Sequence, residues 1–587
     1  MNIDHSWRYT TLGVLLSSMA FFIIVQMVRI QVSPQANELR EKNLEVSGYH
    51  KILIPARGQI YDREGNLLAG NTTAYEVGVD LAQIKNPATF AMALNAVLDV
   101  DYDRVFAAAS TPLSDKAIYV TLARFVNEEQ KTRLEQLAAE MEKTYGNRKM
   151  EERPSLAGLR FEPRLQRKYP ENDLASNVLG FVDWDGKGHF GIEERFDEVL
   201  AGKREIVWIS LDPNRVEEIP EIPPGTSLIL SIDREIQAEV EKIVDQALEE
   251  SGSEAATILV MSPANGDILA MATTTRLNLN EFWRYNEVFE GSTPFNRAVS
   301  ETYEPGSVFK VLTMAAALDS GAVKPKTTFL DTGAIEVGGT IIRNWNGGAW
   351  GPQDMLGCMQ HSLNVCLAWV ATQLGANRFY DYLQAFGIGQ LTGIDLALES
   401  PGHLKLPGDS DWYEADLGTN SFGQGVAVTP IQFITAVSAI ANKGQMVYPR
   451  IVLSMIDQGR QYNTSPRIIA SPISENTAQK LSEMLATSLE VESSAALVEG
   501  YRVAGKTGTA EIPTPYGYTS SQTNASFVGW GPIDDPRFLV FVWLHKPTTS
   551  PWGSVVAAPV FRQVVERLVI LMGIPPDNVR QQLLEGQ

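Results

Sequence analysis

The feature that most constrains this chain is a serine placed between two helix breakers and a helix-forming run. Pro305 and Gly306 suit a helix interior poorly, whereas every residue from Ser307 to Leu318 suits a helix. The sequence therefore predicts that Ser307 lies at a helix start. Lys310 would then lie about one turn further along the same face, where its amine could remove the hydroxyl proton. The unpaired backbone N–H groups of a helix start also favour an anion that forms there.

A purely structural explanation of this pattern exists, because a serine often caps a helix and a lysine on the next turn is often exposed. Two later stretches favour a chemical role. Residues 361–364 (HSLN) supply a second hydroxyl at Ser362 and a carboxamide at Asn364, and residues 505–509 (GKTGT) supply a cation and two hydroxyls. The three motifs follow one another as Ser-x-x-Lys, Ser-x-Asn and Lys-Thr-Gly, and this ordered set is far more specific than any one of them.

The ordered set resembles the motifs of the penicillin-recognising serine acyltransferases: the penicillin-binding proteins, the serine β-lactamases and the β-lactam sensors. The resemblance implies a ping-pong acyl transfer that uses no cofactor. The D-Ala-D-Ala end of a peptidoglycan stem peptide would acylate Ser307, D-Ala would leave, and an amine of a neighbouring stem peptide would attack the ester. β-Lactams would imitate the donor and leave an acyl-enzyme that hydrolyses slowly.

Five side chains are expected to carry this reaction. Ser307 is the expected nucleophile, and it needs a base to remove its proton. A free lysine amine, with a pKa of about 10.4, would be charged. Lys310 can therefore act as the base only if burial and a second cation lower its pKa, and Lys506 is the candidate for that cation. Ser362 is expected to pass a proton between Lys310 and the leaving amine, and Asn364 to hold Lys310 or the substrate.

The remaining expected groups bind the charges of the substrate. An oxyanion hole is expected from the backbone N–H groups of Ser307 and Thr509. The residues expected to bind the terminal carboxylate of the donor peptide are Lys506, Thr507, Gly508 and Thr509. Two positions depart from the usual pattern of class B penicillin-binding proteins, since Leu363 stands where serine is common and Glu511 where glutamine is frequent. Neither departure removes a catalytic group.

An upstream stretch resembles the class B penicillin-binding proteins in particular. Residues 57–69 (RGQIYDREGNLLA) look like the opening of the non-catalytic pedestal of that class, and residues 59–61 and 66–69 read as two strands of a hairpin. Further pedestal-like segments lie at residues 167–170, 177–182 and 191–196. The implied architecture is that of a peptidoglycan D,D-transpeptidase of the division or elongation type rather than a free β-lactamase.

The expected fold class is α+β, with an N-terminal transmembrane helix, an elongated and mostly β pedestal, and a transpeptidase domain. That domain is expected to hold a five-stranded antiparallel sheet with helices on both faces. Its strands are predicted at residues 256–261, 268–273, 507–513, 526–530 and 537–544. Helices are predicted at residues 127–143, after a cap at Asp233, and from about residue 555 to residue 572.

The expected domain boundaries follow from these segments. They are a cytoplasmic tail at 1–8, a transmembrane anchor at 9–30, a juxtamembrane connector at 31–50, the pedestal or dimerisation domain at 51–222, the transpeptidase domain at 223–575 and a C-terminal tail at 576–587. Residues 220–225, with three prolines and a glycine, are the expected hinge between the last two domains.

The apolar stretch at residues 10–28 is long enough to span a membrane. A cleaved signal peptide usually has a shorter apolar region that ends in small residues, and residues 26–31 (QMVRIQ) offer no such site. An uncleaved, single-pass anchor is therefore expected. Charge does not settle its orientation, because basic residues flank it on both sides. The family resemblance implies that the N-terminus lies inside the cytoplasmic membrane and the catalytic domain outside it.

Composition excludes several other classes of protein. The formal net charge of −21 and a pI near 4.9 argue against a nucleic-acid-binding surface. The six histidines are scattered without the spacing of metal ligands, so no metal site is expected. The two cysteines, Cys358 and Cys366, bracket the Ser-x-Asn motif; if both lie on a helix, they are expected to be too far apart to form a disulfide.

Rival motifs are weaker. Residues 500–507 satisfy the P-loop pattern G-x-x-x-x-G-K-[ST], but a P-loop needs a helix at its lysine, and residues 507–513 read as a strand leading to a proline-rich loop. A Ser-His-Asp hydrolase is disfavoured because no G-x-S-x-G elbow is present and His361 has no evident partner. A class A β-lactamase would carry a Glu-x-x-Leu-Asn run, which is not found. A D,D-carboxypeptidase or a membrane β-lactam sensor stays open.

A non-catalytic scaffold is the alternative from another functional class. The anchor and the pedestal would suit that role, and a polytopic glycosyltransferase of the SEDS family is an expected partner through both segments. The complete set of motif residues weighs against a degenerate site. The sequence does not distinguish a role in division from one in elongation, and it does not identify the acceptor amine.

Overall fold

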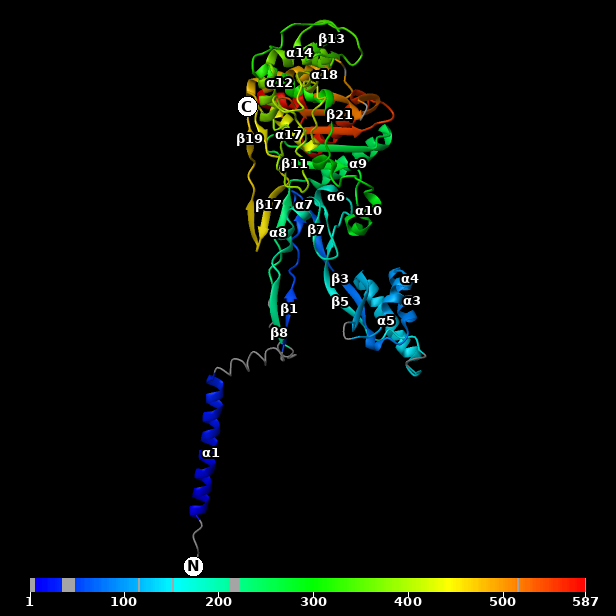
Figure 1. Cartoon of the computed structure of the whole chain (residues 1–587), viewed down its shortest axis with the longest axis vertical. Helices are drawn as coiled ribbons and strands as arrows, with labels where there is room; N and C mark the ends of the chain where they lie inside the picture. Colours follow the sequence, from blue (N-terminus) through cyan, green and yellow to red (C-terminus); the bar gives the residue numbers. More distant parts are fainter. Residues whose placement is uncertain are drawn as a thin grey trace, which may run out of the picture. The chain divides into compact units, whose positions relative to one another are not determined.

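A computed structural model describes residues 6–33, 48–114, 117–149, 153–210, 221–492, 494–514 and 517–585 of the chain (Figure 1). The chain divides into two compact units. The first comprises Met1–Ala56 and Gly202–Gly225, and the second comprises Arg57–Ala201 and Thr226–Gln587. The predicted hinge at 220–225 begins at a residue outside the described ranges and ends where the first unit ends.

The first unit contains one long helix and a two-stranded ribbon. Helix α1 (Ser6–Val32) is apolar, exposed along its length, and long enough to cross a membrane. It extends beyond the predicted span of 9–30 at both ends. Strands β1 (Gly48–Leu53) and β8 (Glu205–Ser210) pair antiparallel. Most of the predicted connector at 31–50 lies outside the described residues.

Strand β3 (Leu67–Asp80) organises the pedestal. Its first residues pair with β2 (Ile60–Tyr61), which confirms the predicted hairpin, and the rest of the strand pairs with β5 (Leu159–Lys168). The opposite edge of β3 pairs with β4 (Tyr119–Val126). Among the strands that the structure describes, β4 has no other partner, so one of its edges is free.

Three helices share a core with these pedestal strands: α3 (Pro87–Leu98), α4 (Tyr102–Ala109) and α5 (Glu128–Tyr145). Leu94, Val105 and Leu134 are fully buried in that core. Helix α5 confirms the predicted helix at 127–143. Asn127 and Gln130 begin it with a capping box, in which each side chain accepts a hydrogen bond from the backbone N–H of the other residue.

A buried ion cluster joins three of the pedestal segments. Glu193, at 0% exposure, accepts hydrogen bonds from the Nε atoms of Arg57 and Arg167, each over 2.7 Å. Arg57 also donates to Asp197 over 2.7 Å. A carboxylate or guanidinium is costly to bury alone, so the cluster fixes these segments against one another.

Other short elements complete the pedestal and link it to the next domain. They are η1 (Leu81–Gln83), α6 (Ser176–Leu179), β6 (Phe181–Val182), β7 (Gly188–His189), α7 (Gly191–Arg195) and α8 (Asp197–Ala201). Strand β2 also pairs in parallel with β9 (Ser227–Leu230), which pairs with β17 (Val452–Asp457) and, beyond it, β18 (Arg460–Asn463). One sheet therefore runs from the pedestal into the following domain.

The predicted five-stranded antiparallel sheet is confirmed. Its strands, in spatial order, are β11 (Ile268–Thr273), β10 (Ala255–Met261), β22 (Phe538–His545), β21 (Gly517–Gly531) and β20 (Ala504–Thr514), so β20 is an edge strand. Successive residues of β10 face opposite layers, as a pleated strand requires. The predicted strand at residues 507–513 lies within β20, and its last residue, Pro513, pairs with Tyr518 in the β20–β21 hairpin.

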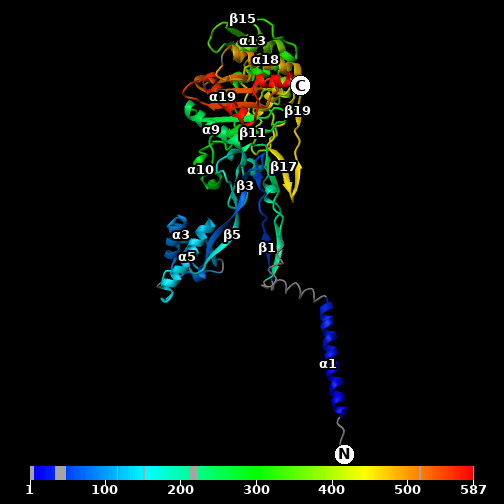
Figure 2. The ribbon, with the colours of Figure 1, turned by 180° about the vertical axis from the view of Figure 1, so that it is seen from behind.

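Helices cover both faces of this sheet. Helices α9 (Arg234–Ser251) and α19 (Gly553–Leu571) pack on one face (Figure 2), and helices α12 (Lys310–Asp319), α17 (Pro430–Ala441) and α18 (Glu475–Val491) lie on the other (Figure 1). Asp233 caps α9 as predicted, since its Oδ1 accepts hydrogen bonds from the N–H groups of Glu235 and Ile236, both over 3.1 Å. Helix α19 confirms the predicted C-terminal helix.

The remaining elements surround this layered core. They are η3 (Leu279–Arg284), α10 (Tyr285–Val288), α11 (Arg297–Ser300), β12 (Phe329–Asp331), β13 (Ala334–Val337), β14 (Thr340–Arg343), β15 (Gly351–Gln353), α15 (Ala376–Ala385), α16 (Glu414–Asn420), β16 (Met446–Val447), β19 (Ile468–Ala470) and α20 (Asp577–Glu585).

We expect Glu193→Gln to destabilise the protein. The substitution leaves Arg167 buried without a carboxylate and Arg57 with Asp197 alone, and breaking a buried ion pair in this way costs about 3–5 kcal/mol. Thermal unfolding of the full chain in detergent, followed by circular dichroism, measures the change. The matched control is Glu198→Gln, because that carboxylate is exposed on α8. Equal unfolding temperatures for the Glu193 variant and the wild type would contradict the expectation.

Candidate active site

Ser307 lies in a tight turn that leads into a buried helix. The turn is the 3₁₀ segment η4 (Gly306–Phe309), and helix α12 begins only at Lys310. The serine therefore lies one turn before the α-helix, and not at its start as predicted. A 3₁₀ turn has about three residues per turn, so Ser307 and Lys310 still lie on the same side of the segment. Ser307 is partly exposed, whereas Lys310 is fully buried.

The Lys310 side chain ends among three oxygen atoms of the Ser-x-Asn motif. Its Nζ donates hydrogen bonds to the carbonyl oxygen of Ser362 over 2.6 Å, to the Oγ of Ser362 over 3.1 Å and to the Oδ1 of Asn364 over 2.7 Å. The Asn364 amide in turn donates to the carbonyl oxygen of Arg343 over 3.2 Å, which fixes its orientation. The structure therefore brings together the side chains of two predicted motifs.

The charge state of Lys310 is set by its surroundings. Burial lowers the pKa of the Lys310 amine well below its usual range, and the nearby Lys506 cation lowers it further. No carboxylate contributes to this shift. An amine with a lowered pKa can be neutral at physiological pH, and a neutral amine can accept a proton.

Ser362 lies at a sharp corner between helix α13 (Met355–Gln360) and helix α14 (Asn364–Leu374). Its φ of +52° is in the left-handed region, which turns the chain between the two helices. The corner also overturns the prediction for the cysteines. On one continuous helix, Cys358 and Cys366 would be about 12 Å apart. Across the corner their Cα atoms are 6.0 Å apart, and they form a disulfide.

Edge strand β20 carries the Lys-Thr-Gly motif directly against the serine turn, because glycines leave no side chain between them. Gly306 has a φ of +59°, and a Cβ atom on it would lie 2.8 Å from the carbonyl oxygen of Thr509. A Cβ atom on Gly508 would lie 2.8 Å from Val308 Cγ1. Both contacts are too short for any other residue, so the backbones of β20 and η4 touch here.

The other residues of the motif face the same region. Lys506 is 4% exposed, and its Nζ donates to the carbonyl oxygen of Thr507 over 3.1 Å. Burial lowers the pKa of Lys506 to about 8, against the opposing effect of the Glu492 carboxylate. The Oγ1 of Thr509 accepts a hydrogen bond from the backbone N–H of Gly553 over 3.0 Å. Because Lys506 lies within a strand and not at a helix start, the P-loop interpretation is wrong.

Several residues at the rim of the site carry no short motif and were not predicted. Trp345 donates to the carbonyl oxygen of His361 over 3.4 Å, beside the Ser-x-Asn corner. Trp552 precedes the glycine that bonds Thr509, beside the Lys-Thr-Gly strand. The two indoles meet edge to face with ring centroids 5.4 Å apart, and they are 54% and 41% exposed. Only the fold brings them together, so no sequence pattern could have paired them.

His361 has partners that the sequence did not reveal, but they do not form a hydrolase triad. Its ring stacks on Trp350 with centroids 4.2 Å apart, and its Nδ1 lies 3.4 Å from a carboxylate oxygen of Glu492. The expectation that His361 has no partner is therefore wrong. Glu492 also raises the pKa of Lys506, so one acidic residue contacts His361 and acts on the Lys-Thr-Gly motif.

A family model for the penicillin-binding protein transpeptidase domain matches residues 256–566, more than half of the chain. The chain belongs to the penicillin-binding proteins. A second model, for the dimerisation domain of these proteins, matches residues 52–225. This second match covers the predicted pedestal, so the penicillin-binding protein consists of a dimerisation module followed by a transpeptidase domain.

Curated relatives cover most of this penicillin-binding protein. Stage V sporulation protein D of Bacillus subtilis is 32% identical over 538 residues, which are 89% of this chain and 79% of that protein. Peptidoglycan D,D-transpeptidase FtsI of Escherichia coli is 25% identical over 97% of this chain and 93% of its own length. The PbpB protein of Mycolicibacterium smegmatis is 32% identical over 70% of this chain, and the match spans 65% of PbpB.

The chain is also similar to solved structures of the same family. Penicillin-binding protein 3 of Mycobacterium tuberculosis, in complex with aztreonam, superposes with a TM-score of 0.68 at 26% identity, covering 90% of this chain and 98% of that one. A peptidoglycan synthetase of Bifidobacterium adolescentis has a TM-score of 0.68 at 27% identity, with the same coverage.

Because the reaction needs Lys310 neutral and Lys506 charged, we expect a bell-shaped dependence of the acylation rate on pH. Lys310 must be neutral to act as a base, and Lys506 must be charged to bind a carboxylate. The rate of labelling by a fluorescent penicillin should therefore rise as pH passes the lowered pKa of Lys310, and fall above pH 8, where Lys506 loses its proton. Initial labelling rates across the pH range measure both limbs.

The control for this expectation is Lys506→Arg. A guanidinium stays charged across the whole pH range of such a measurement. The variant should therefore lose the alkaline limb while it keeps the acid limb. An alkaline limb that stays near pH 8 in the arginine variant would assign it to another group.

Proposed function

We propose that the chain is a serine-type peptidoglycan D,D-transpeptidase that forms its acyl-enzyme on Ser307. The observation that carries this proposal is the buried Lys310 amine, which is held by Ser362 and Asn364 and has a pKa lowered by burial and by Lys506. A base in this state, one turn from a partly exposed serine, is what activation of a hydroxyl requires.

In the first half-reaction, Lys310 Nζ takes the proton of Ser307 Oγ while Oγ forms a bond to the carbonyl carbon of the penultimate D-Ala. The backbone N–H groups of Ser307 and Thr509 bind the oxyanion of the tetrahedral intermediate. The C–N bond to the terminal D-Ala then breaks. Its nitrogen takes the proton from Lys310 through the hydroxyl of Ser362, and D-Ala leaves as an amine.

In the second half-reaction, the amine of a neighbouring stem peptide attacks the ester carbon. Lys310 takes the proton of this amine, again through Ser362, and returns it to Ser307 Oγ as the ester bond breaks. The product is a peptide cross-link, and the enzyme is restored. Attack by water in place of the amine would make the chain a D,D-carboxypeptidase.

The terminal carboxylate of the donor is bound by Lys506, Thr507, Gly508 and Thr509, from edge strand β20. A charged ammonium with hydroxyls beside it suits a carboxylate. β-Lactams carry an anionic group at the equivalent place, so they acylate Ser307 in the same orientation and inhibit the enzyme. The aztreonam complex of the mycobacterial relative and the D,D-transpeptidase name of FtsI support this proposal.

The membrane and partner assignments are part of the same proposal. Helix α1 anchors the protein as a single pass in the cytoplasmic membrane, with the N-terminus inside and the catalytic domain outside. The domain boundaries predicted from the sequence, with a pedestal at 51–222 and a transpeptidase domain at 223–575, accord with the two family models. A SEDS-family glycosyltransferase contacts α1 and the pedestal and supplies uncrosslinked strands.

Labelling by a fluorescent penicillin tests the nucleophile. Wild-type protein in detergent should take one label per chain, carried by the peptide that contains Ser307, and Ser307→Ala should take none. The thermal unfolding of both proteins shows whether the variant is folded. Label retained by a folded Ser307→Ala variant would refute the assignment, and a wild type that took no label would favour a non-catalytic scaffold.

Ser362→Ala tests the proton relay. General acid–base catalysis contributes about 10²–10⁴-fold in rate, so we expect acylation to slow by a factor in that range. The Oδ1 of Asn364 and the backbone carbonyl of Ser362 still hold Lys310, so binding of the β-lactam should change little. Stopped-flow acylation at several β-lactam concentrations separates the rate from the affinity. A weaker affinity with an unchanged rate would make Ser362 a binding residue only.

A further inference from the structure

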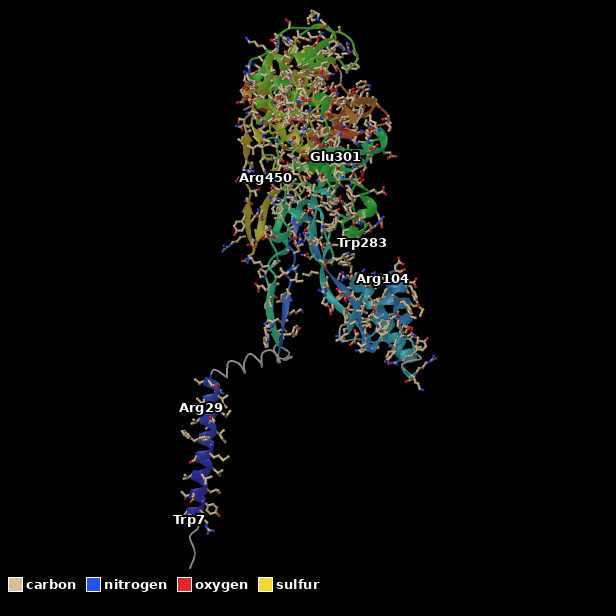
Figure 3. All side chains as sticks on the ribbon, viewed as in Figure 1. Trp7, Arg29, Arg104, Trp283, Glu301 and Arg450 are labelled. Carbon is tan, nitrogen blue, oxygen red and sulfur yellow. A yellow bond between two sulfur atoms is a disulfide. The ribbon has the colours of Figure 1, made fainter. Side chains whose placement is uncertain are left out.

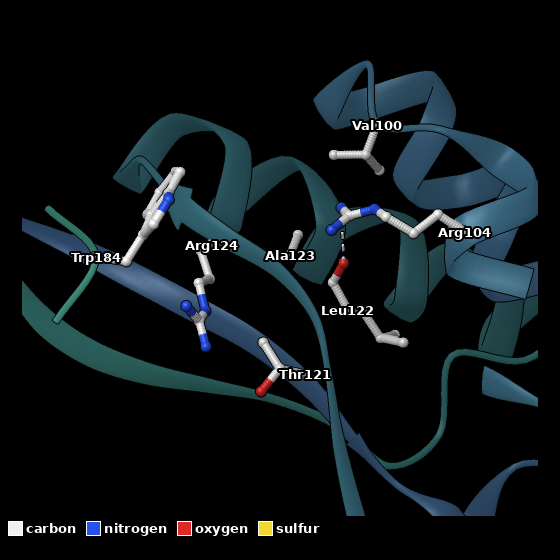
Figure 4. Close-up of a pocket in the computed structure, with 7 residues that line it drawn as sticks. All are labelled: Val100, Arg104, Thr121, Leu122, Ala123, Arg124 and Trp184. Carbon is white, nitrogen blue, oxygen red and sulfur yellow. Dashed lines mark hydrogen bonds between the residues drawn. The ribbon is translucent and has the colours of Figure 1, made fainter. Parts of the chain in front are cut away.

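A pocket of about 460 Å³ opens in the pedestal, at the free edge of strand β4 (Figure 4). Its lining residues are Val100, Arg104, Thr121, Leu122, Ala123, Arg124 and Trp184. Residues 121–124 belong to the edge strand β4, and Arg104 belongs to helix α4. Val100 lies just before that helix, and Trp184 lies in the turn after β6. The volume falls in the range of small-molecule sites, which is about 300–1,000 Å³. Neither the transpeptidase chemistry nor the core packing accounts for it.

The pocket has two arginines and no acidic residue among its lining side chains, in a chain whose formal net charge is −21. Arg104 donates one hydrogen bond, from Nη2 to the carbonyl oxygen of Leu122 over 3.3 Å, and Figure 4 shows it directed at that carbonyl. Neither Arg104 nor Arg124 forms an ion pair with a residue that the structure describes. Two guanidinium groups thus present free donors to a ligand, and guanidiniums bind carboxylates through paired hydrogen bonds.

Trp184 lines the other side of the pocket and belongs to an aromatic stack that extends beyond the lining residues. The centroid of the Trp184 ring lies 4.3 Å from the centroid of the Phe125 ring and 5.6 Å from that of the Trp283 ring. The Trp184 and Trp283 rings are nearly parallel. Trp184 and Trp283 are 43% and 52% exposed, and Figure 3 labels Trp283 and Arg104. Exposed indoles that are already held in place offer a rigid apolar surface with an electron-rich face. The C–H face of a pyranose ring packs on such a surface.

The edge of β4 is a poor site for a protein strand. The carbonyl oxygen of Leu122 is taken by Arg104, and Phe125 has a φ of +58°, which interrupts the extended backbone. The pairing of β3 with β4 also shifts register at this point. Blocked carbonyls and bulges are how native edge strands avoid pairing with another chain. A ligand bound through side chains fits this surface better.

We infer that this pocket binds a strand of uncrosslinked peptidoglycan. A pyranose ring packs on Trp184 and the neighbouring Trp283, and carboxylates of the attached stem peptide pair with Arg104 and Arg124. The inference rests on the proposed function for its substrate class, because a transpeptidase acts on a polymer that repeats sugars and carboxylates. The pocket holds the glycan chain, whereas the serine site holds one peptide end.

Binding of soluble uncrosslinked strands to the full chain in detergent tests the inference, with the active site first acylated by penicillin G. We expect Arg104→Gln/Arg124→Gln to raise Kd by about tenfold or more, and Trp283→Ala to raise it several-fold. Glutamine keeps a donor for the Leu122 carbonyl, so the fold should persist. Arg133→Gln, at an exposed arginine of α5, is the matched control and should bind as the wild type.

Three further probes separate the contributions. A neutral chito-oligosaccharide and a free stem peptide should each bind more weakly than the strand, and polyglutamate should not compete. Equal binding of the strand by wild type and double variant overturns the inference and leaves the pocket to a protein partner. Polyglutamate that competes as well as the strand reduces it to general anion binding. Fluorescent-penicillin labelling of a separate portion of each protein, not treated with penicillin G, reports on Ser307 separately, so failure of the proposed function is distinguishable.

Discussion

The buried amine of Lys310 is the constraint on which the rest of the active site depends. An ammonium with no carboxylate partner is costly to bury, so the amine must be neutral or must bond well to oxygen atoms. The corner at Ser362 and Asn364 supplies those oxygens, and Lys506 on the edge strand discourages the charged form. The helix, the corner and the strand therefore have to meet at one point, and the layered sheet with its two sets of helices holds them there.

Much of this arrangement could be predicted from the sequence because it is written in local patterns. The order of the three motifs indicated the family, the turn residues at 262–267 indicated the first two strands of the sheet, and Asp233 and Asn127 indicated where two helices begin. What failed was the geometry between helices. Cys358 and Cys366 were expected to be apart because a continuous helix was assumed, and the left-handed residue at 362 gives no signal in the sequence.

Other features could not be predicted because they depend on residues far apart in the chain. Trp345 and Trp552 meet across more than 200 positions, and Glu492 reaches both His361 and Lys506 only in the folded domain. The distribution of charge on the pedestal could not be predicted either. A strongly acidic composition excluded a general basic surface, yet it did not reveal one pocket where two arginines have no acidic partner among the residues that the structure describes.

The close approach of β20 to the serine turn limits how this protein can vary. A Cβ atom on Gly508 would meet Ser526 Oγ at 2.4 Å, and one on Gly553 would meet the carbonyl oxygen of Gly508 at 2.1 Å. Any side chain there would force the strand away from the nucleophile. The enzyme would then lose its reaction with the substrate together with its reaction with the inhibitor. Inherited changes that lower sensitivity to a β-lactam while preserving growth are therefore expected away from these glycines, for example at the exposed Trp345 and Trp552, where a side chain can be exchanged without moving the strand.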